Sequence, residues 1–494
     1  MRRQNAFLLA AIMALSFAVS SCGDAAGGNT AATDYASSDV TSGDTTSAET
    51  DYLDTLELRD FDGYEYRIIA QSYDQRPNLP LADEETGEIL NDTIIARNRR
   101  VEELLDIKIV NMPFENRDEV KSKVRTAAMS DEDAYDLVIT SINFGINTLI
   151  TDGCLYDISA LPNLDLSQPW WCQSIRSDYE VDGHFYFTSG PISPFYFYTP
   201  GFVAYNKTLT DANGIEGLEQ TVKDGKWTFD YLKELTVGKA VDLNGDGKLD
   251  ENDRYPISGA SGDPYFLIGF DEKMIGRTAD DGFRFNMTDE DFVNKVEALA
   301  NYYSDKSTFA NYSGAQNKIS MKMFQEDHAM FNVTTMNNVI TGYEDLPSFR
   351  EMKSDYGLLP LPKYDENQKN YVTISQPAGP AGVAVPSTCR DAERNSLIME
   401  VMAYLSNDSI RSAAYDKIVK GKGARVEGTE EMLNIIYENI VYDMNYVFDF
   451  GGSKTAMTDF FSKNSGDYVS KITAKMEKAE AALDKYVSML KEFN

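Results

Sequence analysis

Apolar runs and amphipathic segments alternate between residues 64 and 140, and this alternation constrains the fold more than any other feature. The runs Tyr64–Ala70, Ile107–Val110 and Tyr135–Thr140 are rich in apolar residues, as strands are when both faces of a sheet are covered. The segments Asn91–Leu105 and Asp118–Met129 between them have the pattern of helices. Strand, helix, strand, helix, strand predicts an α/β fold with a mostly parallel sheet.

The second half of the sequence contains more helical patterns. Thr288 is predicted to cap a helix with acidic residues at 289–291, where the helix dipole favours carboxylates. Further helices are predicted over Asp391–Ser406 and Asp467–Phe493. The last one has an apolar stripe: Val469, Ile472, Met476, Ala479, Leu483, Tyr486 and Leu490. This stripe favours a helix packed on its own domain, and a coiled-coil seam is the alternative.

The first residues form a targeting segment. Arg2 and Arg3 precede the apolar run Ala6–Val19, which is shorter than the roughly 20 residues that span a bilayer. The run ends in Val19-Ser20-Ser21-Cys22, which resembles a bacterial lipobox. Residues 1–21 are therefore predicted to be a lipoprotein signal peptide, with lipid on Cys22. The alternative is an ordinary cleaved signal with an incidental cysteine.

Residues 22–55 are predicted to be a flexible tether. Between Gly23 and Asp51 the chain is almost entirely Ala, Gly, Ser, Thr and Asp, without Lys or Arg. Such a segment reaches roughly 30 Å, since the r.m.s. span is ~5–6 Å times the square root of its length. It would hold a body that starts near Leu56 just off a membrane.

Charge and composition exclude several functions. The net charge is −33 and the pI about 4.4, which argues against nucleic acid and against anionic lipid as partners. His184 and His328 are the only histidines, so a catalytic triad or a His-rich zinc site is not expected. Walker, G-x-S-x-G and H-E-x-x-H motifs do not occur. The 79 acidic residues are too many for a glycosidase carboxylate pair to be identified by sequence.

Three cysteines remain besides Cys22, namely Cys154, Cys172 and Cys389. An odd number leaves at least one thiol unpaired within the chain. Whether Cys154 and Cys172 pair is left open by the sequence.

Residues 242–253 read D-L-N-G-D-G-K-L-D-E-N-D and match the calcium loop of an EF-hand. Calcium prefers six to eight hard oxygen ligands, which alternate residues of a tight loop direct to one point. The predicted ligands are the side chains of Asp242, Asn244, Asp246, Asp250 and Asp253 and the backbone carbonyl of Lys248. Position 12 is Asp instead of the usual Glu. A structural calcium site is expected, and a turn that binds no metal is the alternative.

Aromatic residues gather in the middle of the chain. Trp170 and Trp171 are adjacent, residues 185–198 contain many aromatic side chains, and Tyr265 and Phe266 follow. Aromatic faces with polar edges suit sugar rings. The alternative is that most of these side chains belong to the core.

Short segments in a fixed order from about residue 56 to the C-terminus resemble those of a known family. They are Asn91-Asp92 before Arg97-Asn98, Tyr135–Val138, Trp170-Trp171, Tyr205–Lys207, Trp227–Phe229 before the 242–253 loop, Tyr356–Lys363 and Ala378–Pro386. Together they resemble the extracellular solute-binding lipoproteins of ABC importers, in the branch related to maltose-binding proteins.

This resemblance implies a two-lobed, periplasmic-binding-protein-like fold of type II, whose lobes are joined by a hinge that the chain crosses more than once. Ligand would bind in the cleft, and the lobes would close on it. The approximate division expected is 56–165 plus 365–411 for lobe 1. Lobe 2 would comprise 166–364 plus 412–494 and would contain the 242–253 loop.

The resemblance also suggests ligand-binding residues. Asp263, Tyr265 and Phe266 correspond to a sugar-contacting stretch, and Phe331 and Thr334 lie in another cleft-lining segment. Tyr73 and Asn143 follow predicted strands at their carboxyl ends, where α/β sheets place ligands. Trp170 and Trp171 complete the expected set.

The leading interpretation is a monomeric solute-binding protein without catalytic activity, lipid-anchored at the extracytoplasmic face of the bacterial cell membrane. It would deliver a small-molecule solute, an oligosaccharide, to an ABC permease. Two alternatives remain open: a surface-anchored carbohydrate-active hydrolase, and a solute sensor for a membrane kinase.

Overall fold

The computed structural model describes residues 51–72, 82–312, 316–342, 346–419, 426–463 and 466–492. The predicted signal peptide, Cys22 and most of the predicted tether lie outside the described residues, and so does Tyr73. Within the described ranges, no helix combines the length and the apolarity needed to cross a membrane.

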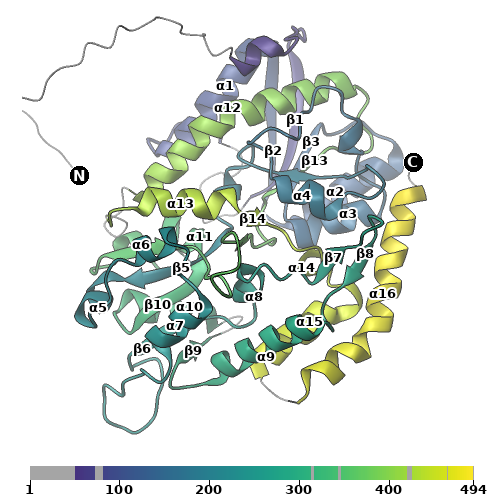
Figure 1. Ribbon diagram of the computed structural model, residues 1–494. Helices are drawn as coiled ribbons and strands as arrows, with labels where there is room; N and C mark the ends of the chain where they lie inside the picture. Colours follow the sequence, from purple (N-terminus) through teal and green to yellow (C-terminus); the bar gives the residue numbers. More distant parts are fainter. Residues whose placement is uncertain are drawn as a thin grey trace, which may run out of the picture. The chain divides into compact units, whose positions relative to one another are not determined.

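The first sheet has the strand order β2-β1-β3-β13-β4. Its strands are β1 (Tyr64–Gln71), β2 (Ile107–Phe114), β3 (Leu137–Thr140), β4 (Thr188–Ser189) and β13 (Gly382–Ala384). β1 pairs in parallel with both β2 and β3, so the predicted parallel sheet is confirmed. β13 joins antiparallel to β3. The connecting helices are α1 (Ile89–Leu105) and α2 (Arg117–Ser130), and α1 lies beside the long α12 (Ala392–Val419) (Figure 1).

The second sheet has the order β11-β5-β10-β6-β9. Its strands are β5 (Gly201–Asn206), β6 (Tyr255–Gly259), β9 (Phe309–Asn311), β10 (Ala329–Thr335) and β11 (Tyr356–Leu359). β6 lies parallel to β10 and β9, whereas β5 is antiparallel to its neighbours. Each sheet forms the centre of one lobe, and the predicted two-lobed α/β fold is confirmed.

Shorter elements complete the two lobes. Strands β7 (Ile275–Arg277) and β8 (Phe283–Phe285) form a hairpin. The remaining short helices are α3 (Asn147–Thr151), α4 (Gln173–Tyr179), α5 (Lys207–Ala212), α6 (Leu218–Lys223), α7 (Phe229–Thr236), α8 (Tyr265–Gly269), α10 (Asn317–Gln325), α11 (Met336–Ile340), α13 (Thr429–Glu438) and α14 (Met444–Phe448).

The hinge consists of several chain segments held side by side. The first hinge segment lies between β4 and β5. Its Pro200 forms an isolated antiparallel β-bridge with Ser375, which belongs to a second hinge segment. In that second segment, β12 (Thr373–Ile374) pairs in parallel with β14 (Ile440–Val441) of the third. Side-chain hydroxyls add to these contacts, because Thr199 and Ser375 share a hydrogen bond of 2.6 Å. The expected hinge with more than one crossing is present.

The predicted lobe boundaries differ from the strand arrangement. β4, at residues 188–189, pairs with β13 in the first sheet, so the chain leaves lobe 1 later than the predicted boundary at 165. The boundary at 411 falls inside the continuous helix α12. Local sequence patterns do not record which distant strands pair, so the place of β4 in the first sheet could not be derived from them.

The body also begins earlier than predicted. Tyr52–Thr55 forms a short 3-10 helix capped by Asp51, so the last residues of the expected tether belong to the folded part. The Tyr52 ring packs edge-on against Trp170, with 4.7 Å between ring centroids. Together with the hydrogen bond of 2.7 Å from Tyr404 to Asp51, this contact holds the end of the low-complexity stretch against the folded body.

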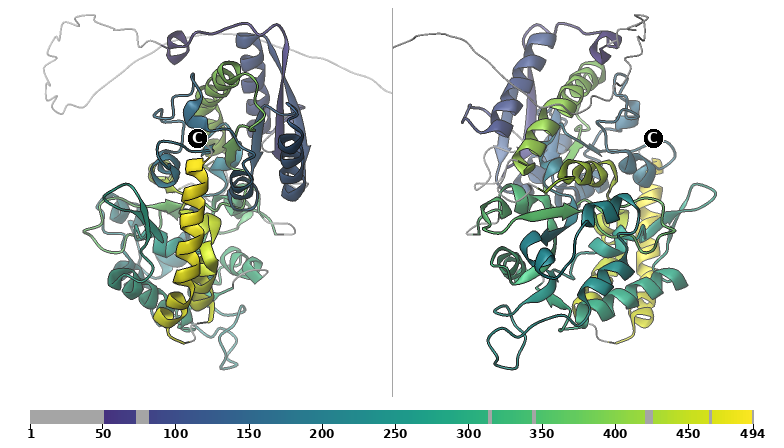
Figure 2. Two further views of the ribbon diagram at one scale, coloured as in Figure 1. Left: turned by 90° about the vertical axis from the view of Figure 1, so that its right-hand side faces the viewer. Right: turned by 60° about the vertical axis from the view of Figure 1, so that its left-hand side comes forward.

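The C-terminal helix α16 (Tyr468–Glu492) packs on its own lobe, against α15 (Ser453–Lys463) and α9 (Glu290–Ser304) (Figure 2). The buried stripe matches the predicted one from Ile472 to Leu490. At its start, however, Tyr468 is buried and Val469 is exposed. The packed-helix prediction is therefore confirmed.

Candidate functional site

A cavity of about 330 Å³ lies where the carboxyl ends of β6 and β10 meet the hinge. In α/β sheets this edge is the usual place for ligands, and the volume is within the range of about 300–1,000 Å³ for small-molecule sites. The described lining residues are Phe195, Tyr198, Thr199, Ala260, Asp263, Tyr265, Asn317, Val333, Thr334, Thr335, Asn337, Asn338, Gln376, Ala378 and Gly379.

Aromatic rings form one part of this wall. Phe195 and Tyr198 belong to the hinge segment before β5 and stack with 5.2 Å between their centroids. Two glycines let rings approach the backbone. A Cβ on Gly379 would lie 2.2 Å from the Phe195 ring, and one on Gly201 would lie 2.5 Å from the ring of Tyr265. The aromatic wall therefore depends on these two positions staying without a side chain.

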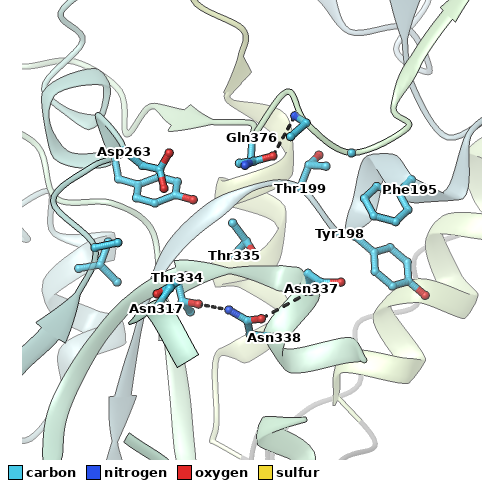
Figure 3. A pocket seen from close by; sticks show the side chains of 15 residues that line it. Phe195, Tyr198, Thr199, Asp263, Asn317, Thr334, Thr335, Asn337, Asn338 and Gln376 are labelled. Carbon is cyan, nitrogen blue, oxygen red and sulfur yellow. Dashed lines mark hydrogen bonds between the residues drawn. The ribbon is translucent and has the colours of Figure 1, made fainter. Parts of the chain in front are cut away.

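Hydroxyl and amide groups form the floor, as Figure 3 shows. Asn338, on α11, donates from Nδ2 to Oγ1 of Thr334 at 2.5 Å. Its own Oδ1 accepts a weak hydrogen bond from Asn337 at 3.5 Å. On the hinge side, the Gln376 side-chain oxygen accepts the backbone N–H of Ala378 at 2.9 Å. This leaves the Gln376 amide nitrogen as a donor for the cavity.

Asp263 is the only charged residue among the described lining residues. It lies across the cavity from Phe195 and Tyr198 (Figure 3). Its Oδ1 accepts a hydrogen bond of 2.5 Å from the hydroxyl of Tyr446. Burial raises the pKa of this carboxyl, and the bond from Tyr446 partly offsets that effect.

The cavity brings together three of the predicted ligand-binding residues, Asp263, Tyr265 and Thr334. Phe266 is fully buried, and its ring stacks on that of Tyr303. Adjacent helical residues point in different directions, so Tyr265 lines the cavity and Phe266 the core. Phe331 is also fully buried. It lies near the start of β10, whereas the cavity is at the other end of that strand.

The structure places Trp170 and Trp171 in the core of lobe 1, away from the cavity, which corrects their prediction as ligand contacts. Both indole N–H groups donate to the carboxylate of Glu400, each at 3.1 Å. Tyr52 donates to the same carboxylate at 2.9 Å. Because both indoles are buried and satisfied within the protein, the core alternative holds for this pair.

Asn143 lies beside the cavity without being among its lining residues. It belongs to a short π-helix, Ile142–Ile146, which follows β3. Its backbone N–H donates to the carbonyl of Pro377 at 3.3 Å, and Pro377 is flanked by the lining residues Gln376 and Ala378. The neighbouring Ile142 N–H donates to the same carbonyl at 2.8 Å, so the first lobe holds the hinge wall of the cavity in place.

Several lining residues were not among the predicted ones. Phe195 and Tyr198 belong to the aromatic-rich stretch, so density alone gave a signal for them. Asn337, Asn338 and Gln376 had no sequence signal, because amides are common on surfaces and only the fold brings these together.

The 242–253 loop closes through its own backbone. Asp242 accepts the N–H groups of Gly245 and Gly247 at 2.6 and 2.9 Å, and Gly247 has a positive φ of 78°. Asp253 is buried and accepts the N–H groups of Leu243 and Asp250 at 2.9 and 3.0 Å. In the described part of the chain, no group of three or more His, Cys, Asp or Glu side chains converges so as to hold a metal ion. Calcium binding stays a prediction.

The cysteines of the described part carry free thiols. Cys154 and Cys172 are both buried and unpaired, and Cys389 is half-buried. Burial raises the pKa of the Cys172 thiol to about 11. The open question of a Cys154–Cys172 bridge is thereby answered in the negative.

No protein-family model matches the sequence, and no curated protein matches it either. Solved structures do share its fold. The cyclic α-maltosyl-1,6-maltose binding protein of Arthrobacter globiformis is similar with a TM-score of 0.57 and 14% identity, over 86% of this chain and 100% of that chain. The galacto-N-biose/lacto-N-biose I-binding protein of the ABC transporter from Bifidobacterium longum has a TM-score of 0.51 and 14% identity, over 86% and 98%.

UgpB from Mycobacterium tuberculosis, in complex with glycerophosphocholine, is similar with a TM-score of 0.50 and 13% identity, over 86% of this chain and 99% of that chain. At identities this low, the three likenesses establish the fold and leave the ligand to be argued from the cavity.

Proposed function

We propose that this chain is an extracytoplasmic solute-binding protein that captures a neutral oligosaccharide and delivers it to an ABC permease. One observation carries the proposal. The cavity at the hinge combines aromatic rings with hydroxyl and amide groups, and none of its described lining residues is Lys or Arg.

This chemistry suits a sugar. A sugar ring has an apolar C–H face, which packs on aromatic rings, and hydroxyls around its rim, which form hydrogen bonds with polar side chains. In this cavity Phe195, Tyr198 and Tyr265 provide the aromatic rings, and seven neutral polar side chains provide hydrogen-bonding groups. A phosphate-bearing solute would call for cationic donors such as Arg or Lys. Two of the three structural relatives are named for carbohydrate ligands, whereas glycerophosphocholine carries a phosphate.

The carboxylate content of the cavity favours binding over hydrolysis. Glycoside hydrolases use two carboxyl groups on either side of the scissile bond, about 5–10 Å apart. Asp263 is one such group, and the described lining residues include no second Asp or Glu. We therefore infer that the solute leaves the cavity unchanged.

A thermal-shift screen tests the proposal. Lacto-N-biose, maltotriose and glycerophosphocholine would each be added to the pure protein, since a ligand that binds only the folded state raises Tm. We expect a neutral sugar to raise Tm and glycerophosphocholine to leave it unchanged. A rise with glycerophosphocholine alone would contradict the sugar assignment. Release of monosaccharide at enzymatic rates would favour the hydrolase alternative.

We also propose that lipid on Cys22 anchors the protein to the membrane. The motif Val19-Ser20-Ser21-Cys22 supports this, and firm anchoring needs more than one acyl chain. The variant Cys22→Ser should appear in the medium or stay uncleaved. A cleaved Cys22→Ser protein that still partitions with membranes would contradict the anchor.

Co-purification of the wild type with a permease, as opposed to a membrane kinase, would separate transport from sensing.

A further inference from the structure

Tyr446 contacts the lining residue Asp263 from a part of the chain that contributes no described lining residue itself. It belongs to α14, after the third hinge segment, and its hydroxyl donates to Oδ1 of Asp263 at 2.5 Å. The tyrosine itself is buried, with 5% of its surface exposed. The contact therefore joins the C-terminal part of the chain to the only charged residue among the described lining residues.

The position of Tyr446 is fixed by Asp443, which caps α14. Asp443 Oδ1 accepts the backbone N–H of Tyr446 at 2.9 Å, and its Oδ2 accepts that of Met274 at 2.8 Å. Burial raises the pKa of the Tyr446 phenol well above its ordinary value. The phenol thus remains a hydrogen-bond donor across the physiological range.

The bond from Tyr446 makes the two oxygens of Asp263 unequal. Oδ1 accepts the Tyr446 hydroxyl, whereas Oδ2 receives no hydrogen bond from the described residues. An ionised carboxylate accepts several hydrogen bonds, so Oδ2 keeps its capacity for a donor that enters the cavity. No described lining residue is a Lys or Arg that could fill this role.

We propose that Tyr446 is a positioning residue that orients Asp263 so that Oδ2 accepts a hydroxyl of the bound solute. The inference rests on the proposed function and sharpens it, because the site then selects solutes with a donor at this point and rejects anions. A carboxylate held by one short bond from the protein needs little reordering when the solute arrives.

The titratable groups that face Asp263 define how the site responds to pH. They are Tyr446 on α14, Tyr265 on α8, Tyr303 on α9 and Lys454 on α15. Burial raises the pKa of Asp263, and the Tyr446 bond and the Lys454 charge lower it. Removal of the Tyr446 hydroxyl should therefore raise this pKa further, which a merely structural role for the ring would not do.

The first experiment needs no solute. The carboxyl carbon of Asp263 is followed by NMR against pH in ¹³C-aspartate-labelled protein, with its signal identified by loss in Asp263→Asn. In Tyr446→Phe the titration midpoint should move to higher pH. The control Tyr404→Phe removes a comparable bond, from Tyr404 to Asp51 at 2.7 Å, and should leave Asp263 unchanged. An equal midpoint in wild type and Tyr446→Phe would overturn the inference.

The second experiment measures solute affinity by calorimetry with lacto-N-biose and maltotriose between pH 5 and 8. Loss of one hydrogen bond to a charged group should weaken binding in Tyr446→Phe about tenfold. The acidic limb of the affinity profile, where protonation of Asp263 lowers the affinity, should move to higher pH. Asp263→Asn should remove that limb. Unchanged affinity and pH profile in Tyr446→Phe would refute the positioning role. If the wild type binds neither sugar, the proposed function fails, and the NMR titration still decides whether Tyr446 controls Asp263.

Discussion

Two aromatic clusters in the described part of this molecule lie around a carboxylate, and the hinge cavity is lined by one of them and not by the other. The tryptophan cluster consists of Trp170, Trp171 and Tyr52 around Glu400. The pocket cluster consists of Phe195, Tyr198 and Tyr265, with Asp263 across the cavity. Most of these aromatic residues lie in aromatic-rich stretches of the sequence, and aromatic density alone predicts sugar contacts for both clusters.

The clusters differ in how many donors the protein itself offers to the carboxylate. Glu400 is fully buried and accepts from Trp170, Trp171, Tyr52 and the backbone N–H of Asp165. Asp263 accepts from Tyr446 alone among the described residues. A carboxylate with its lone pairs filled completes a core, and one with a free oxygen can receive a ligand. Aromatic density by itself does not make this distinction.

The largest expected effect is on stability at the tryptophan cluster. Glu400→Ala leaves four donors without their acceptor, and we expect the free energy of unfolding to fall by about 3–5 kcal/mol. Asp263→Ala leaves one donor unpaired and should cost about 1 kcal/mol. Urea denaturation of both variants measures the difference. If the Asp263 variant proves the less stable of the two, the comparison is wrong.

The next effect is the pH dependence of stability. Burial raises the pKa of Glu400 to about 7, from an ordinary value of 4.5, although four hydrogen bonds favour its charged form. The folded state then holds the proton more tightly than the unfolded state does. The stabilising contribution of the protonated form is therefore fully present below about 4.5 and lost as the pH rises to about 7.

We accordingly expect wild type to lose up to about 3 kcal/mol relative to Glu400→Gln over this window, since one pKa unit is 1.36 kcal/mol. The exposed Glu393, which pairs with Arg59, gives the control Glu393→Gln. Because Glu393→Gln keeps Glu400, the loss of stability that Glu400 causes with rising pH should persist in this variant. If the stabilities of wild type and Glu400→Gln change with pH in parallel, the four hydrogen bonds offset the effect of burial on the pKa of Glu400, and the prediction is wrong.

A third prediction uses one glycine that lies against each cluster. A Cβ on Gly379 would lie 2.2 Å from the Phe195 ring, and a Cβ on Gly190 would lie 2.3 Å from the carbonyl of Trp170. Both alanine variants should lose about 1–3 kcal/mol of stability through overpacking. Only Gly379→Ala should also weaken sugar binding, by about tenfold. Calorimetry with lacto-N-biose and maltotriose checks this, and equal loss of affinity in both variants would contradict it.

The sequence predicted the elements better than their assembly. Strands β1 to β3 and the stripe of α16 follow from local periodicity, because each buries a face that its own residues define. The placement of β4 in lobe 1 depends on its pairing with β13, far along the chain. The same limit applies to the site. Asp263 and Tyr265 were predicted through a family resemblance, whereas Tyr446 joins them only through the fold.

The smallest effect concerns the 242–253 loop, which lies outside both clusters. Its donor set of Asp242, Asn244, Asp246, Asp250 and Asp253 with the Lys248 carbonyl suits calcium, and Gly247 adopts the positive φ that a sharp turn needs. Backbone hydrogen bonds lower the pKa of Asp253, so its carboxylate is charged at neutral pH. Against the site stand the bonds that already occupy Asp242 and Asp253.

With a dissociation constant on the order of 10⁻³ M, as in extracellular modules, a few millimolar calcium should stabilise the fold by about 1 kcal/mol. Differential scanning calorimetry with EDTA and then with added calcium measures this on wild type and on Asp246→Ala, which should not respond. Because the loop contributes no residue to the cavity, sugar affinity should stay the same with and without calcium. A wild type without any calcium-dependent shift would make the loop a turn held by its own backbone. A large change in sugar affinity on addition of calcium would instead show that the loop is coupled to the pocket cluster. The number of hydrogen-bond donors to Asp263 would then not be enough to explain binding at that site.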